Sequence, residues 1–193
     1  SDNQETLYIL TINPGGLSTK VALFANETKV RDVSLEHDAE HLKTFGDVLD
    51  QWEFRLQAVE QFLKDNAIDP TSLAAISARG GPFPPLKSGV YAVNDAMIDD
   101  ITGGNMQVPH VSSLGPMIAR ELGNRYQVPA FMVDPVSVDE LPAFARLSGL
   151  KQLPRRSLAH TLNSKYVARK VAKTLQTSYK DTRMVVAHLG SGI

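Results

Sequence analysis

A glycine-containing stretch near the amino terminus has the residue types of a phosphate-binding turn. In TINPGGLSTKVALF, residues 11–24, two adjacent glycines, two hydroxyl side chains and Lys20 separate two apolar runs. A nucleotide-binding P-loop has a glycine directly before its lysine, and Thr19 takes that place here. A dinucleotide fingerprint has three spaced glycines that open onto a helix, whereas residues 21–24 are typical of a strand. The spacing therefore excludes both of these phosphate-binding motifs.

The same stretch predicts a strand, a turn and a returning strand. Gly15 and Gly16 can adopt a positive φ angle, which lets backbone N–H groups approach an anion closely. Ser18 and Lys20 would add a hydroxyl and a cation. An ordinary β-hairpin explains the pattern equally, because Gly-Gly is a common turn. The residues of this stretch alone leave both interpretations open.

Polar side chains also follow four apolar runs, directly before or close to glycine or proline. They are Asn13 in ILTIN-PG, Arg79 in AAISAR-GG, Asp134 in PAFMVD-P and His188 in MVVAH-LG. Ligands of open α/β sheets bind beyond the carboxyl ends of the strands, so these side chains are expected to face one cleft. Each alone has an ordinary structural explanation, such as a turn or a solvated strand end. Their coincidence favours a functional site.

The elements that must position these side chains follow from periodicity and turn residues. Strands are expected at 7–12, 20–24, 29–35, 73–77, 90–93, 128–133 and 184–188, and helices at 45–66, 95–101, 112–126, 138–147 and 157–178. This order predicts a mixed sheet covered by helices. Gly149, Lys151 and Pro154 interrupt the pattern and indicate a boundary near residue 150. The chain stops just after a strand, so we expect a fragment of a longer protein.

Composition excludes several classes of function. Twenty basic and 21 acidic residues give a net charge of -1, so bulk electrostatics favour neither a nucleic-acid nor a membrane partner. The sequence has no cysteine, which excludes disulfides, thiolate metal sites and a cysteine nucleophile. The polar amino terminus does not resemble a signal peptide, and no apolar run approaches transmembrane length. A cytoplasmic location is expected.

Several segments together resemble a known enzyme family. SARGG, HVSSLGP from His110, FMVDPVSVDELPAFARLSG and VVAHLGSGI are similar to the butyrate kinases and their branched-chain acid relatives, acyl-phosphate kinases of the acetate kinase family. The resemblance implies an α/β fold of the actin-like, ribonuclease-H-like type. Residues 1–150 would form one domain with a mixed five-stranded sheet, and residues 151–193 would begin a second, similar domain on the nucleotide side.

The resemblance also implies a function and the residues that perform it. The protein would transfer the γ-phosphoryl group of ATP to a short-chain acid, butyrate above all, or catalyse the reverse reaction with ADP. Arg79, Asp134 and His188 would be catalytic, Arg79 and His110 would bind the substrate, and Asn13 would lie beside Mg²⁺. The nucleotide phosphates would contact Asn13, Gly15, Gly16, Ser18, Lys20, Gly190, Ser191 and Gly192. A homo-oligomer is implied, and these 193 residues alone are expected to be inactive.

The chain departs from the family pattern at two places. Gly16 and Leu17 stand where the family usually has hydroxyl residues, and Val108-Pro109 replaces the usual Gly-Glu before His110. Residues 83–86 either wall the acyl pocket or form a rigid surface loop. His37, His41 and His160 are interpreted as surface or packing residues, and the basic residues of 165–173 as a solvated helix face.

Two other functions stay open. A non-catalytic binding or scaffolding protein would keep the cleft without the chemistry. A sugar-type kinase of the same fold would need Asp134 as a base, because its nucleophile is an alcohol. A carboxylic acid with a pKa of about 4 to 5 is already ionised at neutral pH and needs no base.

Overall fold

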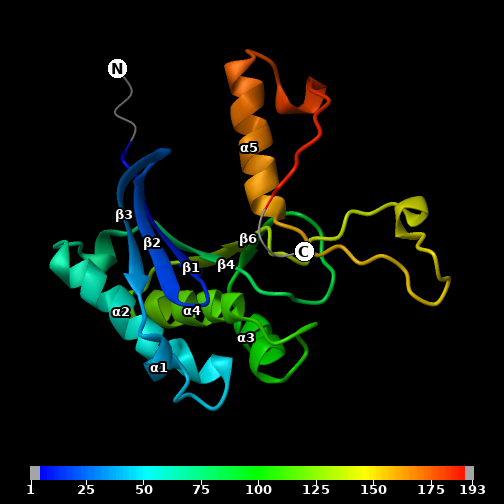
Figure 1. The fold of residues 1–193 in the computed structure, drawn as a ribbon. Helices are drawn as coiled ribbons and strands as arrows, with labels where there is room; N and C mark the ends of the chain where they lie inside the picture. Colours follow the sequence, from blue (N-terminus) through cyan, green and yellow to red (C-terminus); the bar gives the residue numbers. More distant parts are fainter. Residues whose placement is uncertain (1–4, 190–193) are drawn as a thin grey trace.

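The computed structural model describes residues 5–189, which contain a six-stranded mixed sheet with helices on both of its sides (Figure 1). The strand order is β3-β2-β1-β4-β6-β5. The strands are β1 (Tyr8–Pro14), β2 (Ser18–Ala25), β3 (Thr28–Glu36), β4 (Ala75–Arg79), β5 (Val90–Ala92) and β6 (Ala130–Val133). The α-helices are α1 (Ala39–Leu42), α2 (Trp52–Asp65), α3 (Asp95–Thr102), α4 (Leu114–Tyr126) and α5 (Thr161–Thr174). Short 3₁₀ turns lie at Val48–Gln51, Pro70–Ser72, Val111–Ser113, Ala143–Arg146 and Tyr179–Asp181.

The pairing of the strands confirms the predicted mixed sheet. The first three strands are antiparallel neighbours, and β4 and β6 run parallel to β1. The sheet has six strands rather than the expected five, because the three-residue β5 pairs antiparallel with β6 and extends the edge.

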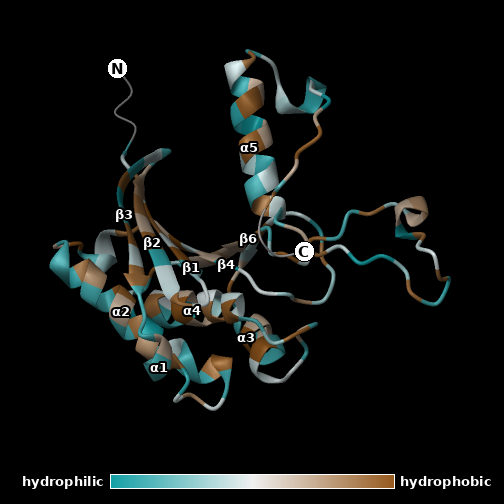
Figure 2. Ribbon diagram, in the orientation of Figure 1, coloured by the Kyte–Doolittle hydropathy of each residue, from teal (hydrophilic) through white to brown (hydrophobic). Residues whose placement is uncertain are grey.

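One face of the sheet packs against α2 and α4. Strand alternation in β1 and β2 turns Leu10, Ile12 and Val21 to this side, where they are almost fully buried. Val59 of α2 and Ile118 of α4 are equally inaccessible and complete the core. Figure 2 shows the brown, apolar side of these elements turned toward the sheet. Burying such a side chain contributes roughly 1.5–3 kcal/mol, so this layer fixes the strands whose ends carry the site.

The opposite face of the sheet is more polar. Asn13 and Lys20 are register partners and therefore share this face, while the flanking Ile12 and Val21 point into the core. Helix α5 stands on this side of the sheet, away from α2 and α4 (Figure 1). The two sides thus separate a packed core from a surface that is open to ligands.

Three expected elements differ in the structure. Residues 184–188 are not a strand, since no described strand pairs with them and Val185 is 99% exposed. The helix expected at 138–147 shrinks to the turn Ala143–Arg146, because Pro142 disfavours helical backbone at Leu141. Helix α5 begins at Thr161 and not at Ser157, whose hydroxyl donates to the carbonyl of Val138.

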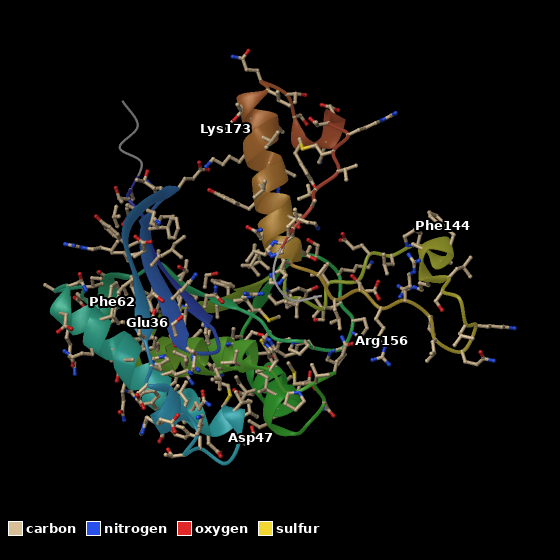
Figure 3. All side chains as sticks on the ribbon, in the orientation of Figure 1. Glu36, Asp47, Phe62, Phe144, Arg156 and Lys173 are labelled. Atoms are coloured by element: carbon tan, nitrogen blue, oxygen red, sulfur yellow. The ribbon has the colours of Figure 1, made fainter. Side chains whose placement is uncertain are left out.

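The segment around residues 139–158 projects from the body of the protein. Phe144 extends from the outer end of this segment, and Arg156 lies on its returning part (Figure 3). Phe144 is 77% exposed. In the described part of the chain, none of the helices has the length and apolar character needed to cross a membrane.

Candidate functional site

Three of the polar side chains predicted from strand ends line one cavity. Register aligns Ile12 of β1 with Ala78 of β4, so Asn13, one residue before the end of β1, and Arg79, the last residue of β4, lie at the same level. Arg79 is in turn aligned with Val133, and Asp134 follows at once. A cavity of about 350 Å³ is lined by Asn13, Arg79, Asp134, Val136, Ala159, His160, Thr161, Leu162, Asn163 and Tyr166. The parallel strands β1, β4 and β6 therefore deliver one polar group each to this cavity.

Asp134 is held in an unusual backbone conformation. Its φ is 38°, in the left-handed region that non-glycine residues rarely adopt, at a cost on the order of 1–3 kcal/mol. Its Oδ1 accepts from the Ser88 hydroxyl at 2.7 Å and from the Gly89 N–H at 2.8 Å, and its own N–H donates to the Gly89 carbonyl. All of these bonds use Oδ1 or the backbone. They fix the carboxylate while Oδ2 is available for a ligand.

Asn13 lines the same cavity and carries an acceptor without a partner. Its Oδ1 is buried and has no hydrogen-bond partner among the described residues. A buried carbonyl oxygen without a donor is unfavourable by about 1–3 kcal/mol, so it indicates a place where a ligand supplies the missing partner.

Arg79 contacts a histidine that sequence reasoning assigned to surface or packing. Arg79 Nη2 lies 3.0 Å from Nδ1 of His160. A guanidinium only donates, so Nδ1 accepts and the neutral imidazole carries its proton on Nε2. The pKa of His160 is lowered by burial first, and then by the nearby charge of Arg79 and by His188 and His110. His160 therefore belongs to the site, and its position just before α5 is fixed by tertiary contacts that no local pattern reveals.

His188 reaches the site without being part of a strand. Its ring stacks on that of His160, with centroids 4.3 Å apart and planes inclined by 4°. Asn163 of α5 lies 3.1 Å from His188 Nδ1. The predicted site residues Arg79 and His188 are thus connected through His160.

His110 lies at a second hollow beside Arg79. This hollow of about 360 Å³ is lined by Arg79, Pro82, Val108, His110, Val136, Leu158, Ala159 and His160. His110 Nδ1 accepts from the Ser112 N–H at 3.1 Å, so the neutral ring has its proton on Nε2. Burial, and then the charge of Arg79, lower the pKa of His110. The hollow combines an apolar wall with one cation and two imidazoles.

Residues 83–86 do not wall this hollow. They lie in a separate one beside β5 and the start of α3. Phe83 is buried there and packs with Val93, Ile101 and Met132. Phe83 therefore neither walls the hollow next to Arg79 nor lies in an exposed surface loop, the two alternatives expected for this segment.

The glycines after Arg79 serve close packing. A Cβ on Gly80 would lie 2.1 Å from Met132 Sδ, and one on Gly81 would lie 2.3 Å from Ser113 Oγ. Gly115 of α4 is similar, because its added Cβ would approach the Arg79 carbonyl at 2.4 Å. The missing side chain of Gly115 lets helix α4 pack closely against the end of β4 at Arg79.

The first hairpin forms as predicted. The strands β1 and β2 pair from Tyr8 with Ala25 to Pro14 with Thr19. Neither Gly15 nor Gly16 uses the positive φ that glycine permits; among the described glycines only Gly104 does. Gly16 is exposed and Ser18 half-buried, and Lys20 is exposed beside Asn13. Gly190, Ser191 and Gly192 lie outside the described residues.

A residue that sequence reasoning missed holds this hairpin from the core side. Arg55 of α2 is completely buried and donates to three backbone carbonyls of the turn. A signal for it existed in the sequence. Arg55 lies three residues after Trp52 and four before Val59, so it occupies a core-facing position of an amphipathic helix. A charged residue at such a position needs a polar partner.

Comparison with known proteins finds curated relatives of this chain. No protein-family model matches it. It is 43% identical over 185 residues to proteins named "Probable butyrate kinase" from two Clostridium botulinum strains, Eklund 17B and Alaska E43. The match covers 96% of this chain and 52% of each relative, so the chain spans about half the length of these curated relatives.

Solved structures share the fold. Acetate kinase from Porphyromonas gingivalis has a TM-score of 0.60 at 13% identity, over 92% of this chain and 51% of that chain. Propionate kinase from Francisella tularensis subsp. tularensis SCHU S4 has a TM-score of 0.54 at 16% identity, over 89% and 50%. These likenesses confirm the actin-like α/β fold. The chain is accordingly a homologue, over about half of their length, of proteins named butyrate kinase, on the fold of the acetate and propionate kinases.

Proposed function

We propose that the protein containing this chain is an ATP-dependent kinase of short-chain carboxylic acids, with butyrate as the first substrate to test. The observation that carries the proposal is the position of Arg79. It lines both the cavity that contains Asn13 and Asp134 and the neighbouring hollow that contains Val108 and His110. Homology to proteins named butyrate kinase supports the same assignment.

The apolar hollow suits the acyl chain. Pro82, Val108, Val136 and Leu158 supply the apolar part of its wall, and Arg79 lines both this hollow and the cavity with Asn13 and Asp134. A planar guanidinium matches the two oxygens of a carboxylate. An acid bound this way would place its hydrocarbon chain among the apolar residues and its carboxylate at the phosphoryl-transfer position. His110 Nε2 is a further donor for an oxygen in this hollow.

The chemistry requires alignment more than proton transfer. A carboxylate oxygen of the acid attacks the γ-phosphorus of ATP, a new O–P bond forms, and the bond to the bridging oxygen breaks so that ADP leaves. The acid is already ionised at neutral pH, so no residue has to remove a proton. Arg79 neutralises charge on the acyl side, and the Nε2–H groups of the histidines are donors for equatorial phosphoryl oxygens. In this proposal His188 stabilises the transferring group through its place beside His160.

Asn13 and Asp134 have the chemistry of a magnesium site. Mg²⁺ prefers oxygen ligands and is commonly held by one or two carboxylates together with substrate phosphates. Asn13 and Asp134 line the same cavity, and Oδ1 of Asn13 has no hydrogen-bond partner among the described residues. The residues present therefore fit the ion, which would neutralise phosphate charge when bound. Asp134 would orient it, and Lys20, Ser18 and the hairpin backbone would contact the nucleotide phosphates.

The test is acyl phosphate formation by the protein as its gene encodes it. Hydroxylamine trapping with ATP, Mg²⁺ and butyrate should give acyl hydroxamate above a control without enzyme, and acetate and propionate should be compared in parallel. Asp134→Asn should abolish the product without unfolding the protein. Absence of product with all three acids would reject the proposed function, and phosphorylation of an alcohol instead would favour the sugar-type kinase.

The remaining expectations stay predictions. They are the domain boundary near residue 150, the contacts of Gly190 to Gly192, a homo-oligomeric assembly and the cytoplasmic location. We also expect residues 1–193 alone to show no kinase activity.

A further inference from the structure

Arg55 is a buried cation directly beneath the phosphate hairpin. Its side chain has 0% exposure, and it donates from Nη1 to the carbonyls of Gly15 at 2.8 Å and Ser18 at 3.1 Å. Nη2 donates to the Gly16 carbonyl at 3.1 Å. The N–H groups of Arg55 also donate to Thr19 Oγ1 and to Gln51 Oε1. None of the ion pairs in residues 5–189 includes Arg55.

A buried charge without a counter-ion is unfavourable unless hydrogen bonds compensate for its lost hydration. Neutral backbone carbonyls, the Thr19 hydroxyl and one amide oxygen accept these bonds, so the positive charge itself is not neutralised. A guanidinium cannot lose its proton under physiological conditions. The arrangement leaves a permanent positive charge behind the turn.

The bonds of Arg55 also orient the peptide groups of the turn. In a planar trans peptide the C=O of one residue and the N–H of the next point in opposite directions. All peptide bonds of the described residues are trans. The carbonyls of Gly15 and Gly16 point inward to Arg55, so the N–H groups of Gly16 and Leu17 point away from it. The Leu17 carbonyl is also engaged, by the His37 N–H at 2.9 Å. Four successive carbonyls, of residues 15 to 18, are thus bound to the protein.

We propose that Arg55 is the positioning residue of the phosphate hairpin: by holding the turn's carbonyls inward it presents the N–H groups of Gly16 and Leu17 outward as an anion site. Successive N–H groups that converge on one side bind phosphate oxygens well. The turn needs no positive φ for this, because the arginine orients the peptides. This inference rests on the proposed function insofar as the anion is a nucleotide phosphate. Arg55 does not contact the substrate itself.

The experiment compares Arg55→Met and Arg55→Lys with the parent in the protein as its gene encodes it. We expect Arg55→Met to raise KM for ATP about ten- to hundredfold, because one oriented N–H to a charged phosphate accounts for a factor of that size. KM for the acid should change less than about threefold, since Arg79 binds that side. Arg55→Lys keeps the charge without the fork and should recover only part of the ATP affinity.

A matched control separates positioning from general stability. Val59 lies one turn further along α2, and its side chain makes none of the hydrogen bonds that hold the hairpin. Val59→Ala removes core packing, so it should lower Tm while leaving KM for ATP within about twofold.

A milder variant covers the case in which Arg55→Met does not fold. Gln51→Leu keeps Arg55 but removes the oxygen that fixes its other edge, and should raise KM for ATP about threefold or more without a large change in Tm.

Binding measurements keep the outcome independent of catalysis. Calorimetric titration with ADP and Mg²⁺ should show the same order of affinities, with Arg55→Met the weakest. If the parent binds ADP in this order but forms no acyl phosphate, the proposed function fails and the inference stands. If Arg55→Met folds and binds ATP and ADP as tightly as Val59→Ala does, the inference is overturned while the proposed function stands. Unchanged affinities in both Arg55→Lys and Gln51→Leu would overturn it if Arg55→Met does not fold.

Discussion

Arg79 and His160 are 81 positions apart in sequence, yet Arg79 Nη2 and His160 Nδ1 lie 3.0 Å from each other. This contact connects the end of a central strand with the start of α5. In this contact Nδ1 of His160 accepts the hydrogen bond, and the ring of His160 in turn stacks on that of His188. The arginine that we assign to the acid is therefore oriented by a residue on a different element, and its geometry depends on how α5 lies against the sheet.

Arg79→Ala should remove most turnover with acyl phosphate while nucleotide affinity stays nearly unchanged. The arginine lies at the acyl hollow, and losing two charge-assisted hydrogen bonds should lower kcat/KM for the acid about a hundredfold or more. Steady-state kinetics combined with calorimetric titration of ADP measure both effects. Arg120→Ala on α4, which removes an arginine outside the cavity, is the control. A large loss of nucleotide affinity with normal acid affinity would contradict the assignment.

Ser88→Ala should weaken catalysis by releasing Asp134. The Ser88 hydroxyl donates to Asp134 Oδ1 at 2.7 Å and, together with the Gly89 N–H, fixes the strained residue. One hydrogen bond to a charged group contributes about 1.5–3 kcal/mol, so kcat should fall roughly tenfold or more and the requirement for Mg²⁺ should increase. Titrating activity with Mg²⁺ measures this effect. Ser72→Ala, at an exposed turn, should behave as the parent. An unchanged magnesium dependence would show that Ser88 does not position the carboxylate.

Acid should destabilise the protein partly through His37. Its Nε2 lies 2.8 Å from Thr19 Oγ1, the side chain is 7% exposed, and burial first, then the charge of Arg55, lower its pKa. A histidine whose pKa is lower in the folded than in the unfolded protein makes its full contribution to stability at pH values above its unfolded pKa, which is near 6.5. This contribution is lost as pH falls from there through the folded pKa, because the unfolded chain then binds more protons.

His37→Gln should therefore flatten the dependence of Tm on pH between about 7 and 5. The glutamine keeps a polar group near Thr19 but does not titrate. His41→Gln, an exposed change in the same segment, is the control. Thermal unfolding followed by circular dichroism at several pH values gives both curves. Parallel curves for the parent and His37→Gln would contradict a role for this histidine.

Much of the sheet was predictable because strand signals are local. Apolar alternation and tight turns fixed β1 to β3, and the polar residue after each buried run located Asn13, Arg79 and Asp134. The errors have tertiary causes. Residues 184–188 have strand propensity but no neighbouring strand, and Ser157 is a good cap whose hydroxyl bonds to Val138 instead. His160 contacts a residue 81 positions away, which no local pattern encodes. Helical spacing indicates that Arg55 faces the core, but not that its partners lie up to 40 positions away.

Gly16→Ser should raise nucleotide affinity. The family that this chain resembles usually has a hydroxyl residue at this position, and the structure removes two objections to restoring one. Gly16 does not adopt a positive φ, so a side chain brings no left-handed strain, and an added Cβ would meet no atom within 4 Å. The Gly16 carbonyl can keep its bond to Arg55, because the substitution leaves the backbone intact.

A new hydroxyl bond to a charged phosphate would contribute about 1.5–3 kcal/mol, of which water already supplies a part in the parent. We therefore expect kcat/KM for ATP to rise up to about tenfold, with Gly149→Ser, an equally open position on the projecting segment, as the control. A lower kcat/KM in the Gly16→Ser protein, at an unchanged Tm, would show that phosphate does not bind on this side of the hairpin.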